Sequence, residues 1–160
     1  MITNDAVQAF LAGHCIAVAG ASDSKNNFGR AIIIALAEHG YYPIPIHPTE
    51  TLVDGRRAYP RLQDVPRQVD GVIVMVTGDA AAEVVGDADA VGIKHVWLFK
   101  GIGGAGAVSA ASLAACERHG IDPVAGACPL MFLEPVTTAH RIHRSIRRHR
   151  GDVETAAVKV

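Results

Sequence analysis

The chain has 160 residues, of which 49% are hydrophobic and 19% charged, with a formal net charge of −1 at pH 7. This length and composition predict one domain with a sizeable core and exclude the uniformly basic surface of many nucleic-acid-binding proteins. The three cysteines form no CxxC pair, and the N-terminus has neither the basic region nor the apolar run of an export signal. We therefore expect a cytoplasmic protein with no membrane segment.

The first predicted element is a short helix. Thr3 or Asn4 can cap it, the apolar residues Val7, Phe10 and Leu11 fall on one face, and Gly13 is placed to end it.

Five apolar runs follow, and each predicts a β-strand. Their apolar character is continuous rather than alternating, which is typical of parallel strands buried on both faces. The five runs are residues 15–19, 42–46, 71–76, 95–99 and 123–125.

Helices are predicted between these strands, over residues 29–39, 79–91 and 105–119, and each is followed by a glycine. The crossover over residues 57–69 contains Pro60 and Pro66 and supports only a short helix at 62–65. The alternation predicts an α/β fold: a doubly wound, mostly parallel five-stranded sheet of the Rossmann-like kind, with right-handed crossovers.

Ligands of such sheets bind beyond the carboxyl ends of the strands, where the winding reverses. We therefore expect the loops after the first and fourth strands to flank one crevice. Both of these loops are rich in glycine. Backbone N–H groups at a helix N-terminus are suited to phosphate. The other interpretation of these glycines is that they only form tight turns and allow close helix–sheet packing. They are Gly20 and Gly29 in the first loop and Gly101, Gly103, Gly104 and Gly106 in the second.

A GxGxxG pattern at Gly101, Gly103 and Gly106 would on its own suggest a dinucleotide. It lies in the last βαβ unit, however, and the acidic residue about twenty positions on, Asp122, begins the next strand instead of ending it.

The second predicted strand ends at His47, so an adenosine ribose would meet no carboxylate there. His47, with Lys25 and Arg30, better suits an additional phosphate on the ribose, as in NADP or coenzyme A (CoA).

Several short motifs follow one another along the chain, and both their order and their spacing are informative. They are Ile16-Ala-Val-Ala-Gly-Ala-Ser22, Phe28-Gly-Arg30, Gly40-Tyr-Tyr-Pro-Ile-Pro-Ile-His-Pro48, Gly55, Tyr59-Pro60, Leu62, Val65-Pro66 and Val69-Asp70. Together they resemble the small CoA-binding domain family, stand-alone Rossmann-type proteins similar to the N-terminal domain of the succinyl-CoA synthetase α subunit. The resemblance runs from Gly13 to Leu133. The chain departs from the family at Ile46-His47-Pro48, where relatives commonly have Val-Asn-Pro, and in the glycine-rich loop after the fourth strand.

The resemblance implies CoA or an acyl-CoA as the ligand, with Lys25, Arg30 and His47 assigned to phosphate. The synthetase's phosphorylated histidine belongs to a second domain, so no residue here takes over its role. The residues expected to bind the cofactor are Gly20, Ala21, Ser22, Lys25, Phe28, Gly29, Arg30, His47, Pro48, Val76, Thr77, Lys100 and Gly101.

The sequence contains no nucleophile elbow, Walker loop or HExxH motif, so we assign no catalytic residue. We expect a non-catalytic CoA-binding protein that acts as a carrier or regulatory module. Two alternatives stay open: an NAD(P)-linked oxidoreductase that uses the loop over residues 101–106, and a CoA-ligase component that needs a partner subunit.

Histidines and cysteines offer weaker candidates. Only His140 and His143 could share a helix face, and two ligands without a nearby carboxylate or thiol predict no metal site. We expect Cys15, Cys116 and Cys128 to be small buried residues, although Cys128 follows the last strand near the ligand edge.

Residues 135–150 predict a basic C-terminal helix, so the domain would span residues 1–150, with its core at 13–133 and a flexible tail at 151–160. The apolar stripe of this helix could dock on the domain while its arginines stay solvated. The alternatives are contacts with an acidic protein partner, a polyphosphate or a second copy of the chain. Nucleic acid is disfavoured, because no aromatic residues lie between the arginines. The arginines are Arg141, Arg144, Arg147, Arg148 and Arg150.

Overall fold

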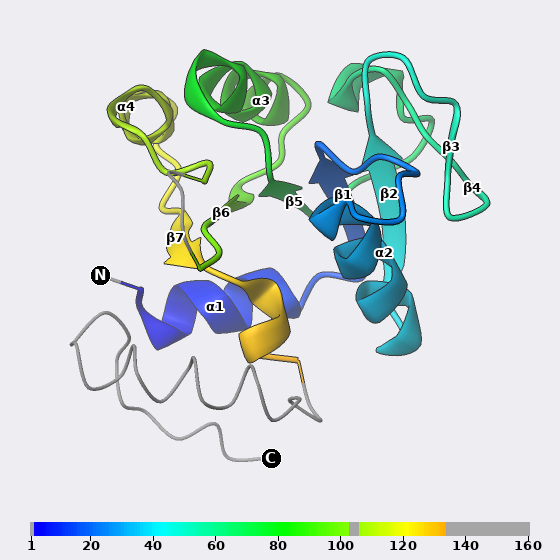
Figure 1. The fold of residues 1–160 in the computed structure, drawn as a ribbon. Coiled ribbons are helices and arrows are strands. Elements are labelled where there is room, and N and C mark those ends of the chain that lie inside the picture. Colours follow the sequence, from blue (N-terminus) through cyan, green and yellow to red (C-terminus); the bar gives the residue numbers. More distant parts are fainter. Residues whose placement is uncertain (1, 103–105, 134–160) are drawn as a thin grey trace.

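The computed structural model describes residues 2–102 and 106–133, and a parallel sheet runs through their middle (Figure 1). The sheet has five strands in the order β2-β1-β5-β6-β7. The predicted helix at 135–150 and the tail at 151–160 lie outside the described residues. The strands are β1 (Cys15–Ala19), β2 (Tyr42–Ile46), β5 (Gly71–Val74), β6 (His95–Phe99) and β7 (Val124–Ala127).

Helices cover both faces of the sheet, with α1 and α2 on one face and α3 and α4 on the other (Figure 1). The predicted doubly wound α/β fold is therefore confirmed. Within the described ranges, no helix combines the length and apolar character needed to cross a bilayer. The helices are α1 (Asn4–Leu11), α2 (Phe28–Glu38), α3 (Gly78–Ala90) and α4 (Ala110–Arg118).

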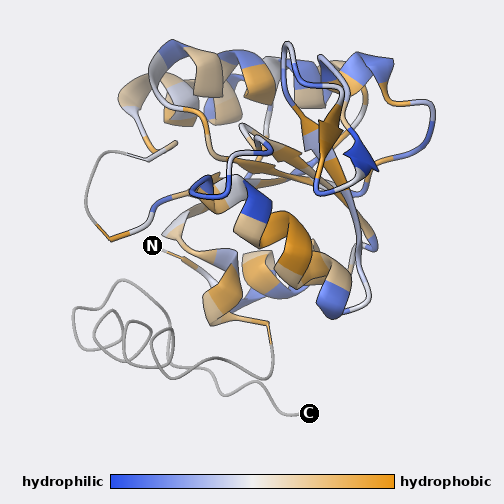
Figure 2. Cartoon of the chain, turned by 45° about the vertical axis from the view of Figure 1, so that its right-hand side comes forward, coloured by the Kyte–Doolittle hydropathy of each residue, from blue (hydrophilic) through white to orange (hydrophobic). Residues whose placement is uncertain are grey.

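Two apolar cores result, one on each side of the sheet. Successive side chains of β1 alternate between them: Ile16 and Val18 join the core under α1 and α2, and Ala17 joins the core under α3 and α4. In the first core the Trp97 ring meets Phe10 edge-on at 5.2 Å, and its indole N–H donates to the Ala127 carbonyl at 2.9 Å. Figure 2 shows hydrophobic residues concentrated in the strands between the helical layers.

The predicted strands at 15–19, 42–46 and 95–99 match the structure residue for residue. The predicted helix at 105–119 begins only at Ala110, because the Ser109 hydroxyl accepts the Ser112 N–H and the Ser112 hydroxyl accepts the Ser109 N–H. The glycines that follow α2, α3 and α4 all have positive φ, as predicted.

Sequence reasoning missed a short hairpin of β3 (Leu52–Val53) and β4 (Arg56–Arg57). It turns at Asp54 and Gly55, with φ values of 50° and 70°. Asp-Gly is a favoured pair for such a two-residue turn, because both positions need positive φ. The signal was thus present in the sequence, but flanking strands of two residues are too short to show a pattern.

The expected position of the crevice needs one correction. β1 pairs with β2 on one side and β5 on the other, so β5 separates it from β6, the fourth long strand along the chain. The loops after the first and fourth strands are therefore not neighbours at the carboxyl edge. The winding reverses between β1 and β5, as in sheets with the strand order 2-1-3-4-5.

The Asp70 side chain links the residues just before β5 to the start of β1. One carboxylate oxygen, Oδ2, accepts the backbone N–H groups of His14 and Cys15, each at 2.8 Å. These hydrogen bonds hold the pKa of Asp70 below its ordinary value. Gly13 is required here by a close contact and not by a positive φ, since an added Cβ would lie 2.8 Å from the Asp70 Cβ.

We predict that Asp70→Asn lowers the free energy of unfolding at pH 7 by about 1 kcal/mol, because the two hydrogen bonds lose their ionic acceptor. A depressed folded-state pKa stabilises the fold above the unfolded pKa of about 4, and this contribution is lost as the pH falls through the folded pKa. The difference between wild type and variant should therefore shrink toward zero below pH 4 in urea titrations. The exposed Asp122, changed to Asn, is the control; a difference for Asp70→Asn that stays constant down to pH 2 would contradict the assignment.

Candidate functional site

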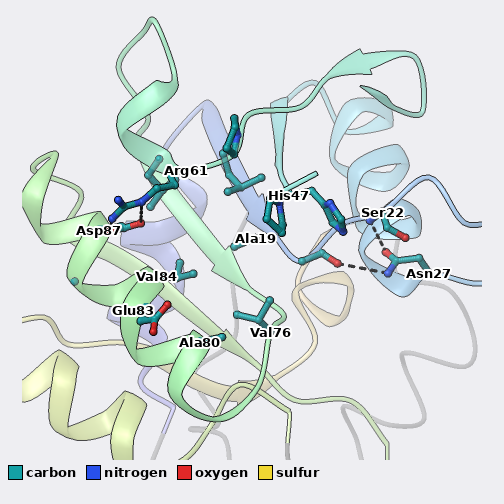
Figure 3. A pocket seen from close by; sticks show the side chains of 16 residues that line it. Ala19, Ser22, Asn27, His47, Arg61, Val76, Ala80, Glu83, Val84 and Asp87 are labelled. Carbon is teal, nitrogen blue, oxygen red and sulfur yellow. Dashed lines mark hydrogen bonds and ion pairs between the residues drawn. The ribbon is translucent and has the colours of Figure 1, made fainter. Parts of the chain in front are cut away.

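A pocket of about 910 Å³ opens at the carboxyl ends of β1 and β2, with α3 as its far wall (Figure 3). We call it the central pocket. Its volume lies at the upper end of the range for small-molecule sites, which is sufficient for a nucleotide-sized ligand. It is lined by Ala19, Gly20, Ser22, Asn27, Ile46, His47, Pro48, Pro60, Arg61, Leu62, Val76, Ala80, Glu83, Val84, Gly86 and Asp87.

Asn27 shapes the loop that joins β1 to α2. Its Oδ1 accepts the N–H of Ser22 at 3.1 Å and the N–H of Arg30 at 3.0 Å, and its Nδ2 donates to the Gly20 carbonyl at 3.4 Å. The same side chain therefore caps α2 and holds the loop against the start of that helix.

Gly29 allows the closest approach in this region. A Cβ at this position would lie 2.7 Å from the Ala21 Cα, a distance that real Cβ atoms do not show. The backbone N–H groups of Phe28 and Gly29 have no acceptor within the described part of the chain. They lie in the first turn of α2, where the helix dipole adds partial positive charge, so they are suited to a phosphate.

His47 lies at the end of β2 and lines the pocket. Its Nδ1 accepts the backbone N–H groups of Thr49 at 3.3 Å and Glu50 at 3.1 Å. A neutral imidazole with Nδ1 as acceptor carries its proton on Nε2, so that atom is a hydrogen-bond donor. Nε2 lies 4.0 Å from a Glu50 carboxylate oxygen.

Carboxylates tie the neighbouring loops together. The Glu50 carboxylate accepts the Asp23 N–H at 2.6 Å, and the Asp23 carboxylate accepts the Asp54 N–H at 2.7 Å. Arg30 joins the same network, through Nη2 to Asp54 at 2.8 Å and Nε to Asp23 at 3.3 Å. The hydrogen bond from Asp54 is the main reason why the pKa of Asp23 is lowered.

The far wall of the pocket carries charged residues from α3. Asp87 forms a two-point ion pair with Arg61, Oδ1 to Nη2 at 2.5 Å and Oδ2 to Nε at 3.1 Å, and Gln63 donates to the same carboxylate at 2.9 Å. Burial alone would raise the pKa of Asp87, but Arg61 and Gln63 outweigh it and hold the pKa below its ordinary value. Glu83 lies on the same wall, one helical turn before Asp87 (Figure 3).

The structure brings together five of the residues predicted from sequence. Gly20, Ser22, His47, Pro48 and Val76 line the central pocket.

The other predicted site residues lie around the pocket or away from it. Ala21 and Gly29 are buried, Lys25 is exposed, and Arg30 is held by carboxylates. Thr77 is the N-cap residue of α3.

Three further predicted residues lie near the end of β6. They are Phe28, Lys100 and Gly101. The Phe28 ring contacts Phe99, the last residue of β6, with 5.4 Å between centroids. Lys100 and Gly101 follow Phe99 in the chain and are not among the residues that line the pocket.

Sequence reasoning missed the wall formed by α3 and by residues 60–62. One signal was available in the sequence. The helix predicted at 79–91 follows the strand predicted at 71–76 almost directly, so the first turns of this helix must border the carboxyl edge of the sheet. No periodicity shows that Glu83 and Asp87 would face the pocket.

The cysteines are buried, as expected. Burial raises the pKa of Cys116 and of Cys128 to about 11, so neither is a thiolate at neutral pH. Over residues 2–102 and 106–133, no group of three or more His, Cys, Asp or Glu side chains is placed to hold a metal ion.

Comparison with known proteins gives a consistent family. The sequence model described as a CoA binding domain matches residues 14–134. A hypothetical protein from Pyrococcus horikoshii is similar in structure, with a TM-score of 0.71 at 26% identity, over 78% of this chain and 84% of its own. A Thermus thermophilus protein has a TM-score of 0.66 at 26% identity, over 78% and 91%.

Similarity also extends to one segment of a larger enzyme. The dinucleotide-forming acetyl-coenzyme A synthetase 1 of Ca. Korarchaeum cryptofilum has a TM-score of 0.57 at 26% identity. The match covers 68% of this chain but 25% of that protein.

We predict that Asn27→Ala lowers the free energy of unfolding by about 1–2 kcal/mol through loss of the cap. It should also speed amide hydrogen exchange at Ser22, whose N–H loses its acceptor. Ser109→Ala is the matched control, because it removes the cap of α4 far from the pocket. Ser109→Ala should cost about 1 kcal/mol and leave Ser22 exchange unchanged. Equal Ser22 exchange in wild type and Asn27→Ala would contradict the role of Asn27 in the loop.

Proposed function

The chain belongs to the CoA-binding domain family, and we propose that it binds coenzyme A or an acyl-CoA in the central pocket. The observation that carries the proposal is the convergence of N–H donors at one edge of the sheet. The free N–H groups of Phe28 and Gly29 begin α2, directly after the pocket-lining residue Asn27, and the Nε2–H belongs to His47, which lines the same pocket.

In the proposed complex the diphosphate lies against the first turn of α2, where N–H groups and the helix dipole favour negative charge. The 3′-phosphate meets His47, with Lys25 near the mouth. Arg30 acts as a positioning residue, because its contacts to Asp23 and Asp54 brace the loop.

The remaining predicted residues would meet other parts of the ligand. Val76, after β5, offers an apolar contact for the adenine, and Thr77 lies next to it in the chain. Lys100 and Gly101 would contact only the part of the ligand that leaves the pocket past Phe28.

We propose a carrier or regulatory role. Within the described ranges the pocket shows no activated nucleophile: the Thr49 hydroxyl lies 3.5 Å from His47 Nδ1, but two backbone N–H groups already occupy that nitrogen. A general base needs a free lone pair directed at the proton it removes.

A CoA-ligase component is the second candidate. It is supported by the similarity to a segment of an acetyl-CoA synthetase, of which this chain covers a quarter. The NAD(P) alternative has less support, because Gly101, the first glycine of the GxGxxG pattern, is not among the pocket residues.

We predict that CoA at about a hundredfold its Kd raises the free energy of unfolding by about 2.7 kcal/mol, or the Tm by roughly 5–10 °C. Thermal unfolding with CoA, 3′-dephospho-CoA, NAD and NADP in parallel measures this. CoA should give the largest shift and 3′-dephospho-CoA a smaller one. A shift with NAD or NADP alone would overturn the proposal, and formation of acetyl-CoA from ATP, acetate and CoA by the chain alone would contradict the carrier role.

His47→Asn tests the phosphate contact directly. The Asn oxygen can replace Nδ1 as the acceptor of the turn, but the Nε2 donor is lost. We expect the affinity for CoA to fall about tenfold, with little change for 3′-dephospho-CoA, in isothermal titrations. His95→Asn, at the opposite end of the sheet, is the control. An unchanged ratio between the two ligands would remove His47 from the 3′-phosphate site.

A further inference from the structure

A second pocket of about 530 Å³ lies at the outer edge of the sheet, beside the first half of β2. We call it the edge pocket. It shares no lining residue with the central pocket. In Figure 1 the hairpin of β3 and β4 lies on the outer side of β2, and it contributes part of the wall. The edge pocket is lined by Tyr42, Pro43, Ile44, Gly55, Arg56, Arg57, Tyr59, Pro66 and Arg67.

Three of these residues are arginines, and none is acidic. Arg56, Arg57 and Arg67 form no ion pair with any carboxylate in the part of the chain that the structure describes. Arg30 and Arg61, in contrast, are both paired with aspartates. The edge pocket therefore concentrates positive charge that the described protein leaves unneutralised.

Aromatic rings hold two of the three guanidinium groups in place. Arg67 lies 4.2 Å from the centroid of the Tyr42 ring, and Arg57 lies 5.3 Å from that of Tyr59. Such cation–π contacts orient a guanidinium without using its N–H donors. One donor of Arg67 faces the Cys15 thiol. The other guanidinium donors of the two arginines stay available to a ligand, and the cost of ordering the side chains on binding is reduced.

Arg56 provides the sharpest sign of a ligand. Its Nε is buried and has no hydrogen-bond partner. Buried donors are nearly always paired, so an orphaned one calls for an explanation such as an absent ligand atom. An anionic oxygen that binds the Arg56 guanidinium would satisfy this donor after a small shift of the side chain.

The strand edge itself argues against a peptide partner. Pro43 and Pro45 have no N–H to offer to an added strand. The Pro45 carbonyl already accepts the Tyr59 N–H at 3.0 Å. Strand addition is therefore disfavoured, and the pocket has the size of a small-molecule site.

We propose that the edge pocket binds a phosphorylated small molecule, with phosphate oxygens accepting N–H groups of Arg56, Arg57 and Arg67. The planar guanidinium matches the spacing of phosphate oxygens, and three such groups around one concave site favour a ligand with more than one negative charge. This proposal stands apart from CoA binding, because it uses different residues on a different part of the sheet.

Inorganic pyrophosphate is the probe, and the Nε–H resonances of the arginines in ¹⁵N-correlated NMR spectra are the readout. We expect saturable shifts at Arg56, Arg57 and Arg67, and none at the exposed Arg118 on α4. Arg67→Gln, at an exposed position, should weaken pyrophosphate binding at least tenfold without unfolding the protein. Arg56→Gln should do the same where it folds, and Arg118→Gln should have no effect.

Three results would overturn the proposal. They are an absence of saturable shifts at the three arginines, an affinity unchanged in Arg67→Gln, and stronger shifts with citrate than with pyrophosphate, which would assign the pocket to carboxylates. The same titration with saturating CoA separates the two sites. Because each arginine reports on its own position, failure of CoA to bind would leave this readout intact.

Discussion

All five strands of the main sheet run in the same direction, and this constraint determines where the central pocket forms. In a parallel sheet every strand delivers its following loop to the same edge. β1 is paired on both sides and buried on both faces, so the chain beyond Ala19 must turn away from the ladder between two neighbours. The chain winds from β1 toward β2 in one direction and from β5 toward β7 in the other, so the reversal between β1 and β5 leaves space at the carboxyl edge of the sheet there.

The end of β1 is held by hydrogen bonds on both sides. The Gly20 N–H donates to the Ile46 carbonyl at 3.0 Å, and the Met75 N–H donates to the Ala19 carbonyl at 2.9 Å. Gly20 then leaves the sheet with a φ of 96°, where a Cβ would lie only 3.0 Å from Val76. A side chain there would be strained and would crowd the next loop. The Asn27 side chain completes the turn with hydrogen bonds to Gly20, Ser22 and Arg30, so the loop beside the pocket is held at several points.

The fold could be predicted from sequence because its signals are local. Continuous apolar runs predict buried parallel strands, and the glycines after the helices predict their ends. The placement of Gly20, Ser22 and His47 at one edge follows from the same logic, since each comes just after a strand. The family resemblance added the ligand class, which no periodicity contains.

What escaped prediction depends on contacts between distant segments. The strand order 2-1-3-4-5 is set by which crossover covers which face, and the sequence pattern is the same for the order in which the first and fourth strands are neighbours. The pairing of Arg30 with Asp23 and Asp54 needs a hairpin too short to be read from its pattern. Arg57 and Arg67 are ten positions apart in sequence but line one pocket, because β4 and the segment before β5 both border β2.

The partners of the arginines distinguish the two pockets physically. Beside the central pocket Arg30 and Arg61 are neutralised by aspartates, so a phosphate placed as we propose would meet backbone N–H groups, the end of a helix dipole and one imidazole. These are short-range, directional donors, and they select a ligand by the position of its oxygens. At the edge pocket three guanidinium groups keep their full charge. Attraction between full charges near the surface is longer in range and is screened by salt, with a Debye length of about 8 Å at physiological ionic strength. Arginine therefore has a structural role beside the central pocket, where it is paired with aspartates, and supplies positive charge at the edge pocket. The difference is whether a carboxylate lies close enough to form an ion pair.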